Sequence, residues 1–239
     1  MSGAGNADMR IEAIVFDIGQ TLAYYPIPLN WSKLYRPAFE NVAEKLGLLI
    51  SEKEFLHIGN TLTKYNTRIN LREVEVSSEM ILREIIDETN ISGELLPDIR
   101  REFYRFFRTD TKIYPEAERT LAEIKRRGIP VATLSDVAYG MDNTYALEDI
   151  GPLLKYIDLP YTSYDIGYRK PRGEGLLRIA SELNLEPSAV AFTGDEQKDI
   201  VCAHNAGAAA ILINRSNEKK NYGQDIEIRD LSELLEIAE

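Results

Sequence analysis

The chain has 239 residues, of which 44% are hydrophobic and 28% are charged, and its formal net charge is -11 at pH 7. This size allows a large hydrophobic core, either in one domain or in a core domain with a smaller companion. The acidic charge weighs against binding to nucleic acid, and no apolar run approaches the roughly 20 residues that cross a membrane. Cys202 is the single cysteine, which excludes an internal disulfide and favours a reducing, cytoplasmic location.

The N-terminal part of the chain contains a polar start and then a predicted strand. Residues 1–8 are small and polar and lack the apolar stretch of a signal peptide, so we expect a flexible tail there. A short run rich in β-branched residues follows from Glu12 to Ile18, which is typical of a buried strand. Asp17 lies near the end of this run, and Gly19 then breaks it.

The segment from Trp31 to about Arg108 has a helical texture. Its apolar residues recur at helical spacing, and Gly47 ends the first run. Helices are expected over residues 34–46, 55–65, 78–88 and 98–107. Because no clear strand pattern interrupts them, this segment is predicted to be an all-helical insertion.

From Tyr114 onward, strand and helix patterns alternate. Strands are expected over residues 129–135, 157–162, 189–193 and 209–213. Helices are expected over residues 115–128, 142–150, 173–183, 200–206 and 231–238. Repeated β-α units of this kind predict an α/β fold, with a parallel sheet covered on both faces. Such sheets bind ligands at the carboxyl ends of their strands.

Several chemically useful side chains follow these predicted strands. Asp17 ends the first strand, Ser135 the next, and Asp195 follows a later one, with Asp199 shortly after. Lys170 lies in a turn before a helix. Carboxylates that gather at one sheet edge repel each other unless a cation is present, and Mg²⁺ prefers such oxygen ligands. One carboxylate could attack phosphorus, while the lysine and the hydroxyl hold phosphate oxygens.

Each of these residues also has a purely structural interpretation. Asp17 could cap a turn, Ser135 with Asp136 could form a helix N-cap, and Lys170 could be a solvated surface residue. Residues 194–199, with Asp195 and Asp199, could be a turn and a helix start whose first turn favours acids. Arg169, beside Lys170, is a further candidate for phosphate binding. The order of the residues along the chain is more specific than any of them alone.

That order resembles the haloacid dehalogenase-like hydrolase superfamily, whose members are mostly phosphatases. The resemblance runs from Ile11 to about Asn214 and rests on four motifs in order: FDIGQTL, TLSD, GYRKP and GDEQKDIVCAHNAG. It implies that Asp17 is the nucleophile. It also implies that Ser135 and Lys170 bind the phosphoryl group.

The same resemblance implies a magnesium site and a domain organisation. Mg²⁺ would lie between Asp17, the Gly19 carbonyl, Asp195 and Asp199, and Thr21 is a further substrate-binding candidate. Residues 9–23 and 112–239 would form a discontinuous Rossmann-like core, and residues 24–111 a helical C1 cap. The expected substrate is a small phosphorylated metabolite, with neither nucleic acid nor membrane as a partner, and the expected state is a monomer or a homodimer.

The chain departs from the family pattern at Gly19, where the family usually carries a second aspartate. That aspartate protonates the leaving group and then activates water. Without it, the enzyme could prefer substrates with good leaving groups, such as acyl or anomeric phosphates, or take the proton from another group. It could also be a phosphoryl-ligand binding or regulatory protein with little turnover. A 2-haloacid dehalogenase is a further alternative, since halide needs no proton, but dehalogenases need no magnesium and usually carry an aromatic residue at this position.

Overall fold

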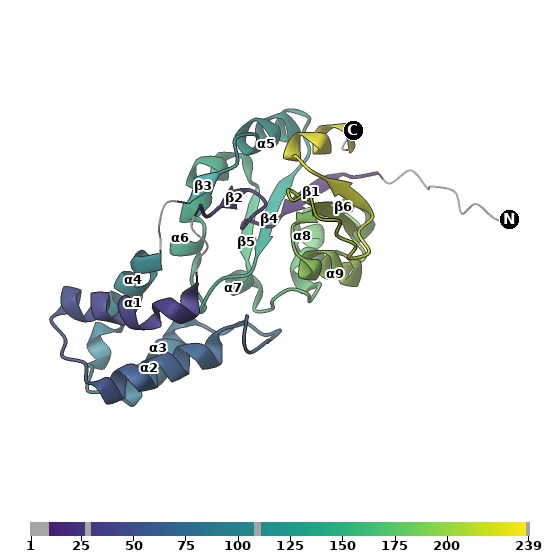
Figure 1. Cartoon of the computed structure of the whole chain (residues 1–239). Coiled ribbons are helices and arrows are strands. Elements are labelled where there is room, and N and C mark those ends of the chain that lie inside the picture. Colours follow the sequence, from purple (N-terminus) through teal and green to yellow (C-terminus); the bar gives the residue numbers. More distant parts are fainter. Residues whose placement is uncertain (1–9, 27–29, 108–110, 238–239) are drawn as a thin grey trace.

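The computed structural model describes residues 10–26, 30–107 and 111–237, so the predicted tail over residues 1–8 lies outside the described part. The centre of the molecule is a six-stranded sheet in the order β5-β4-β1-β6-β7-β8, in which all neighbouring strands are parallel (Figure 1). The strands are β1 (Ala13–Phe16), β4 (Val131–Ser135), β5 (Leu159–Thr162), β6 (Val190–Gly194), β7 (Ala209–Ile213) and β8 (Ile226–Ile228). The predicted α/β fold class is therefore confirmed.

Both faces of this sheet are buried, which explains its nearly continuous apolar strands. Ile14 and Phe16 of β1 join the apolar cluster on one face, while Ala13 and Val15 join the cluster on the other. The first face is covered by α5 (Ala117–Arg126), η2 (Glu148–Tyr156), η4 (Leu231–Glu233) and α10 (Leu234–Ile237). The second face is covered by α8 (Glu174–Glu182) and α9 (Gln197–Ala206), which contains the buried Cys202.

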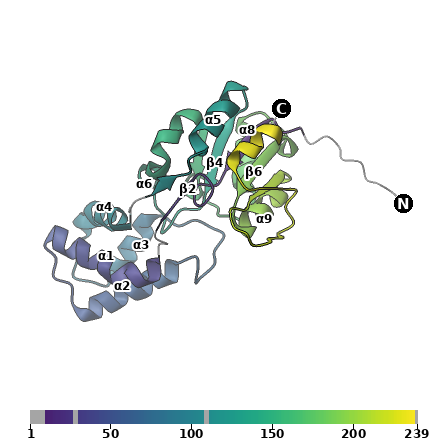
Figure 2. The same ribbon diagram turned by 45° about the horizontal axis from the view of Figure 1, so that its top comes forward.

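Residues 31–107 form a separate layer of helices, here called the helical insert, which stands beside the sheet (Figure 2). The insert has its own apolar cluster, in which Phe39, Leu62 and Phe103 are almost fully buried. Its elements are α1 (Trp31–Leu46), α2 (Glu52–Tyr65), α3 (Ser78–Asp87), η1 (Gly93–Leu95) and α4 (Leu96–Phe107). These four α-helices lie where helical spacing predicted them, while the domain boundaries at residues 24 and 111 stay a prediction.

Three strands and one helix break differ from the sequence-based expectation. The short strands β2 (Ala23–Tyr24) and β3 (Lys112–Ile113) pair antiparallel at the two ends of the insert, and β8 adds an edge to the sheet. Two- and three-residue strands are too short to show alternation. The helix expected over residues 142–150 is instead α6 (Asn143–Ala146) followed by η2, because Ile150 has non-helical backbone angles before Gly151 and Pro152.

The remaining short elements are α7 (Ser163–Ile166) and η3 (Pro187–Ala189). Within the described residues, no helix combines the length and the apolar character that a membrane span requires.

Candidate active site

The sheet topology brings the predicted site residues to one edge. β1 lies between β4 and β6, and Phe16 is in register with Thr133 and Thr193. Asp17 therefore follows β1 at the level where Ser135 ends β4 and Asp195 follows β6. The backbone N–H of Asp17 donates to the Thr193 carbonyl at 2.9 Å, which fixes the start of the loop.

Lys170 is buried between two of the predicted acids. Its Nζ lies 2.9 Å from Oδ1 of Asp17 and 2.6 Å from Oδ1 of Asp199. The loop that carries Lys170 is held by Asp136, whose carboxylate accepts the Lys170 backbone N–H at 3.0 Å. Lys170 is therefore buried beside these acids, and its interpretation as a solvated surface residue is wrong.

Asp17, Asp195 and Asp199 form an acidic triad, with one carboxylate oxygen of each within 4.8 Å of the others. Burial and the neighbouring charges of Asp17 and Asp199 raise the pKa of Asp195 to about 7. Burial also raises the pKa of Asp199, against the attraction of Lys170.

The charge balance of this triad fits a divalent cation. Burial alone would lower the pKa of Lys170, but Asp17 and Asp199 outweigh it and hold that pKa well above its usual value. One ammonium group therefore faces three carboxylates, and the remaining repulsion is what a hard cation with oxygen ligands relieves. The residues present fit such an ion.

Gly194 allows the acidic triad to pack closely. A Cβ atom at this position would lie 2.4 Å from Oδ2 of Asp199, closer than real Cβ contacts. Asp199 is the third residue of α9, and its carboxylate caps the helix by accepting the backbone N–H of Glu196 at 2.9 Å. The glycine before Asp195 was visible in the sequence, but its steric role depends on this contact between strand and helix.

A cavity of about 490 Å³ opens above this cluster, between the sheet edge and the helical insert. Asp17, Gly19, Ser135, Lys170 and Asp195 all line it, as the predicted roles require. Asp199 is fully buried below it.

Thr21 is also fully buried, but it does not line the cavity. Its position therefore gives no support to the predicted contact with substrate.

Charged residues that the sequence analysis did not single out complete the polar rim. Lys198 lies 3.1 Å from both Asp136 and Glu196, and Arg68 of the insert lies 2.7 Å from Glu196. Lys170, Lys198 and Arg169 lower the pKa of Asp136 despite its burial, which by itself would raise it. Lys198 lies within the fourth motif and could have been noticed, whereas Arg68 carries no local signal.

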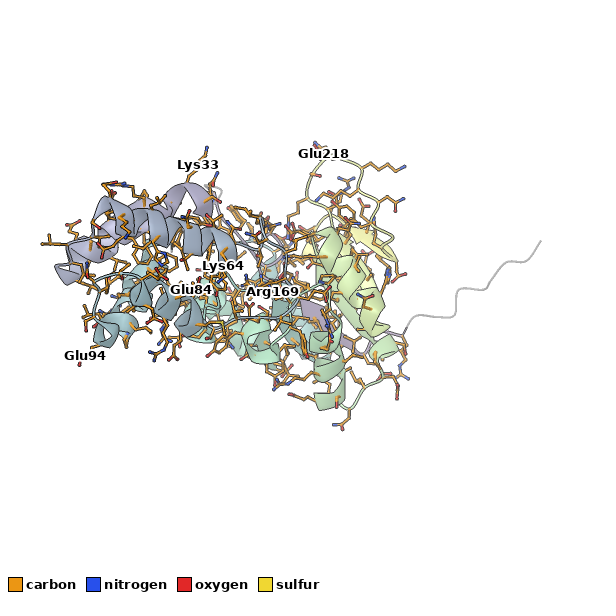
Figure 3. All side chains as sticks on the ribbon, turned by 90° about the horizontal axis from the view of Figure 1, so that it is seen from below. Lys33, Lys64, Glu84, Glu94, Arg169 and Glu218 are labelled. Atoms are coloured by element: carbon orange, nitrogen blue, oxygen red, sulfur yellow. The ribbon has the colours of Figure 1, made fainter. Side chains whose placement is uncertain are left out.

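Arg169, labelled in Figure 3, lines the cavity, but its guanidinium already has partners in Glu75 and the Val137 carbonyl. It pairs with Glu75 of the insert and donates to the Val137 carbonyl at 2.8 Å, and both ionic side chains are at most 5% exposed. Glu75 also accepts the Ser163 hydroxyl at 2.6 Å. The suggestion that Arg169 binds phosphate is not supported by this placement, because its charge is already satisfied.

Comparison with known proteins shows to which family the chain belongs. The model of the haloacid dehalogenase-like hydrolases matches residues 11–207. A phosphatase of Mycobacterium tuberculosis is 27% identical over 228 residues, with 95% of this chain and 96% of that protein covered. A phosphoserine phosphatase of Thermus thermophilus is 29% identical over 160 residues, which is 65% of this chain and only 63% of that relative's length.

Solved structures agree with the fold. A phosphatase of this family from Thermococcus onnurineus aligns with a TM-score of 0.60 at 22% identity, over 95% of this chain and 97% of the other. A 2-haloacid dehalogenase from Pseudomonas syringae aligns with a TM-score of 0.65 at 21% identity, over the same shares of the two chains. Because enzymes of different activities share this architecture, these likenesses show the fold alone. With the family model matched across most of the chain, this protein belongs to the haloacid dehalogenase-like hydrolases.

Proposed function

We propose that this protein is a magnesium-dependent phosphatase that hydrolyses a small phosphorylated metabolite through an aspartyl-phosphate intermediate. The observation that carries the proposal is the cluster of Asp17, Asp195 and Asp199 around Lys170, at the sheet edge and facing a cavity. The phosphatases among the relatives support the same reaction class.

The side chains divide the work between attack and charge stabilisation. Asp17 is the nucleophile, and its carboxylate oxygen attacks phosphorus. Lys170 holds the attacking carboxylate at 2.9 Å and offsets negative charge on the phosphoryl oxygens. Ser135, at the end of β4, donates its hydroxyl to a phosphoryl oxygen. Hydrolysis of the aspartyl-phosphate by water then restores Asp17 and releases phosphate.

The acidic triad is where the metal would bind. Asp17, Asp195, Asp199 and the Gly19 carbonyl would hold Mg²⁺, which when bound neutralises charge on the transferred phosphoryl group. We propose magnesium because all candidate ligands are oxygens and the reaction transfers a phosphoryl group.

The test compares Asp17→Asn with the parent protein and with Asp98→Asn, a control in α4 that does not line the cavity and whose side chain is 40% exposed. Phosphate release is measured with magnesium and with a chelator. The parent and Asp98→Asn are expected to release phosphate only with magnesium. Asp17→Asn is expected to lose several orders of magnitude in rate, as nucleophile removal does in other covalent enzymes. An unchanged rate in Asp17→Asn would refute the assignment.

The two alternatives are separated by the same preparation. Tight calorimetric binding of phosphorylated ligands without phosphate release would favour the binding protein, which Gly19 motivates. Halide release from 2-haloacids would favour the dehalogenase. The acidic triad argues against the latter, because a reaction that needs no metal has no use for three repelling carboxylates.

A further inference from the structure

The cavity above Asp17 has a polar floor, and its roof combines aromatic side chains with the polar Asn66, Thr67 and Arg68. The floor is the sheet edge described above. The roof contains side chains that belong to the apolar cluster of the insert or pack against it and that also line the cavity: Trp31, Phe107, Tyr139, Met141 and Tyr145.

Three of these side chains, Trp31, Phe107 and Tyr139, are joined by ring contacts. Trp31 stacks on Phe107 with ring centroids 3.7 Å apart and an interplanar angle of 16°. Tyr139, from the loop after β4, lies 5.2 Å from Trp31 by centroid. Tyr139 is fixed in place because its backbone carbonyl accepts the hydroxyl of Tyr104 at 2.8 Å. Phe107 and Tyr139 are almost fully buried, so the partly exposed Trp31 and Tyr145 are the rings available to a ligand ring, which would stack or pack edge-on against them.

The size of the cavity agrees with a ring-bearing ligand. About 490 Å³ lies within the range of pockets that hold drug-sized molecules, roughly 300–1,000 Å³. A two- or three-carbon phosphate would leave the aromatic side chains of the roof without a contact.

Gly19 supplies an independent observation about the leaving group. The cavity has no carboxylic acid at this position, so an alcohol leaving group would depart without the proton that the family's second aspartate supplies. General acid catalysis is typically worth about 10²–10⁴-fold. A phenolic oxygen needs this help much less, because phenols ionise near pH 10, as tyrosine does, and aliphatic alcohols are far weaker acids.

We infer that the substrate is a phosphate monoester of an aromatic hydroxyl group, a phenol or a hydroxylated heteroaromatic ring. This inference rests on the proposed phosphatase function and specifies its substrate class. The Asp17 carboxylate oxygen bonds to phosphorus while the bond from phosphorus to the aryl oxygen breaks. The electron pair leaves on the aryl oxygen. One water then attacks phosphorus of the aspartyl-phosphate, the bond from phosphorus to the Asp17 oxygen breaks, and its electron pair restores the carboxylate. Of the two protons of that water, one goes to the aryl oxygen and the other stays on the released phosphate.

The experiment separates the ring from the leaving group. Steady-state kinetics are measured for phenyl phosphate, benzyl phosphate, acetyl phosphate and glycerol 3-phosphate. Benzyl phosphate has a ring but an alkyl leaving group, and acetyl phosphate has a good leaving group without a ring. Benzylphosphonate and ethylphosphonate, which are not hydrolysed, are compared as competitive inhibitors.

Phenyl phosphate is expected to have the highest kcat/KM, exceeding that of benzyl phosphate by roughly 10²-fold or more. Benzylphosphonate is expected to bind more tightly than ethylphosphonate. Trp31→Ala should weaken benzylphosphonate binding about two- to twelve-fold and leave ethylphosphonate binding nearly unchanged.

A matched control tests whether weaker binding could result only from poorer packing of the insert. Phe55→Ala truncates an aromatic residue that packs against the same apolar cluster but does not line the cavity, so it should spare benzylphosphonate binding. Trp31→Phe keeps a ring and should restore most of the binding lost in Trp31→Ala.

Different results would refute the substrate class and the proposed function separately. If phosphate release depends on Asp17 and magnesium but alkyl phosphates equal phenyl phosphate, the aryl substrate is wrong and the phosphatase stands. The same holds if acetyl phosphate is best and the two phosphonates bind equally. If no ester releases phosphate, the proposed function itself fails.

Discussion

At the scale of single residues, the site is defined by which carboxylates are present and which is absent. Asp17 has its neighbours in place, with Lys170 at 2.9 Å and the other two acids within 4.8 Å. Gly19 differs from the family pattern, and the structure leaves room for the missing side chain. A Cβ atom there would meet no heavy atom within 4 Å, and the backbone is not left-handed. The absent acid is therefore not excluded by packing.

The first prediction concerns Gly19→Asp. The new carboxyl group should raise kcat/KM for alkyl phosphates, by up to about 10²–10⁴-fold, and change that for aryl phosphates much less. The reason is that only the alkyl leaving group requires a proton. Steady-state kinetics with benzyl and phenyl phosphate measure the difference directly.

Gly19→Asn is the matched control for this substitution. It has nearly the same shape but cannot donate a carboxyl proton, so it should not reproduce the gain. Equal gains for Asp and Asn, or for alkyl and aryl esters, would mean that leaving-group protonation is not what the site lacks.

At the scale of elements, the insert is joined to the sheet by backbone and side-chain contacts. Glu75 donates its backbone N–H to the Gly167 carbonyl at 2.9 Å, and Arg169 donates to the Glu73 carbonyl at 2.8 Å. The buried Glu75–Arg169 ion pair lies within this junction, next to Lys170. Contacts of this kind hold the roof of the cavity over its floor.

The second prediction is that Glu75→Ala destabilises the protein by about 3–5 kcal/mol, because it removes the closest carboxylate from the buried Arg169 and leaves only Asp136, at 3.9 Å, to balance that charge. The control is Glu79→Ala, which removes a pair with Arg83 whose side chains are 55% and 62% exposed. Such surface pairs contribute at most about 1 kcal/mol. Urea unfolding of the two variants should show this difference, and similar losses would argue against the junction.

The third prediction concerns the pH dependence of the insert. Glu54, at the start of α2, accepts hydrogen bonds from the Ser51 hydroxyl at 2.6 Å, the Ser51 N–H at 2.8 Å and the Asn90 N–H at 2.7 Å. These bonds lower its pKa from 4.5 to about 2. Because the pKa of Glu54 is lower in the folded state, its carboxylate stabilises the folded protein fully above pH 4.5. This stabilisation is lost as the pH falls toward 2.

Thermal unfolding of the parent and of Glu54→Gln, from neutral pH down to about pH 2, checks the sign of this effect. The parent should be the more stable of the two near neutral pH, and the gap should close in acid. A gap that stays constant with pH would show that the carboxylate charge does not contribute.

At the scale of the whole molecule, the negative charge of the protein leads us to expect that a bound metal ion stabilises the folded state. The chain carries a net charge of -11, and three of its carboxylates meet at one buried edge of the sheet. A cation that binds there binds the folded state alone, since the unfolded chain separates the three acids. Metal binding and global stability are therefore linked.

The fourth prediction is that Mg²⁺ raises the melting temperature, corresponding to about 2.7 kcal/mol of stabilisation at a hundred times the dissociation constant. Asp195→Asn should abolish most of this shift, because it removes one charged ligand from the acidic triad. Sodium chloride at equal ionic strength serves as the control for screening. An equal rise in melting temperature with sodium chloride, or in Asp195→Asn, would mean that the stabilisation does not come from metal binding to the acidic triad.

The sequence predicted most of the sheet and the insert, since each signal there is local. The apolar strands, the helical spacing and the helix-ending Gly47 all act within a few residues of their own position. The two-residue strands β2 and β3 and the break near Ile150 were missed, because they depend on pairing with distant segments or on a kink.

The sequence by itself determined the α/β class, the order of the four motifs and the identity of the acids at the strand ends. Only the tertiary structure decided which of those residues meet. In the folded protein Lys170 is buried between Asp17 and Asp199. Thr21 is buried away from the cavity, and Arg169 pairs with Glu75. It also brought aromatic side chains from the insert and from the segment after β4 together at one cavity over the sheet edge. The physical reason is that a side chain's charge and polarity are local properties, whereas its burial and its partners are set by segments far away in the chain.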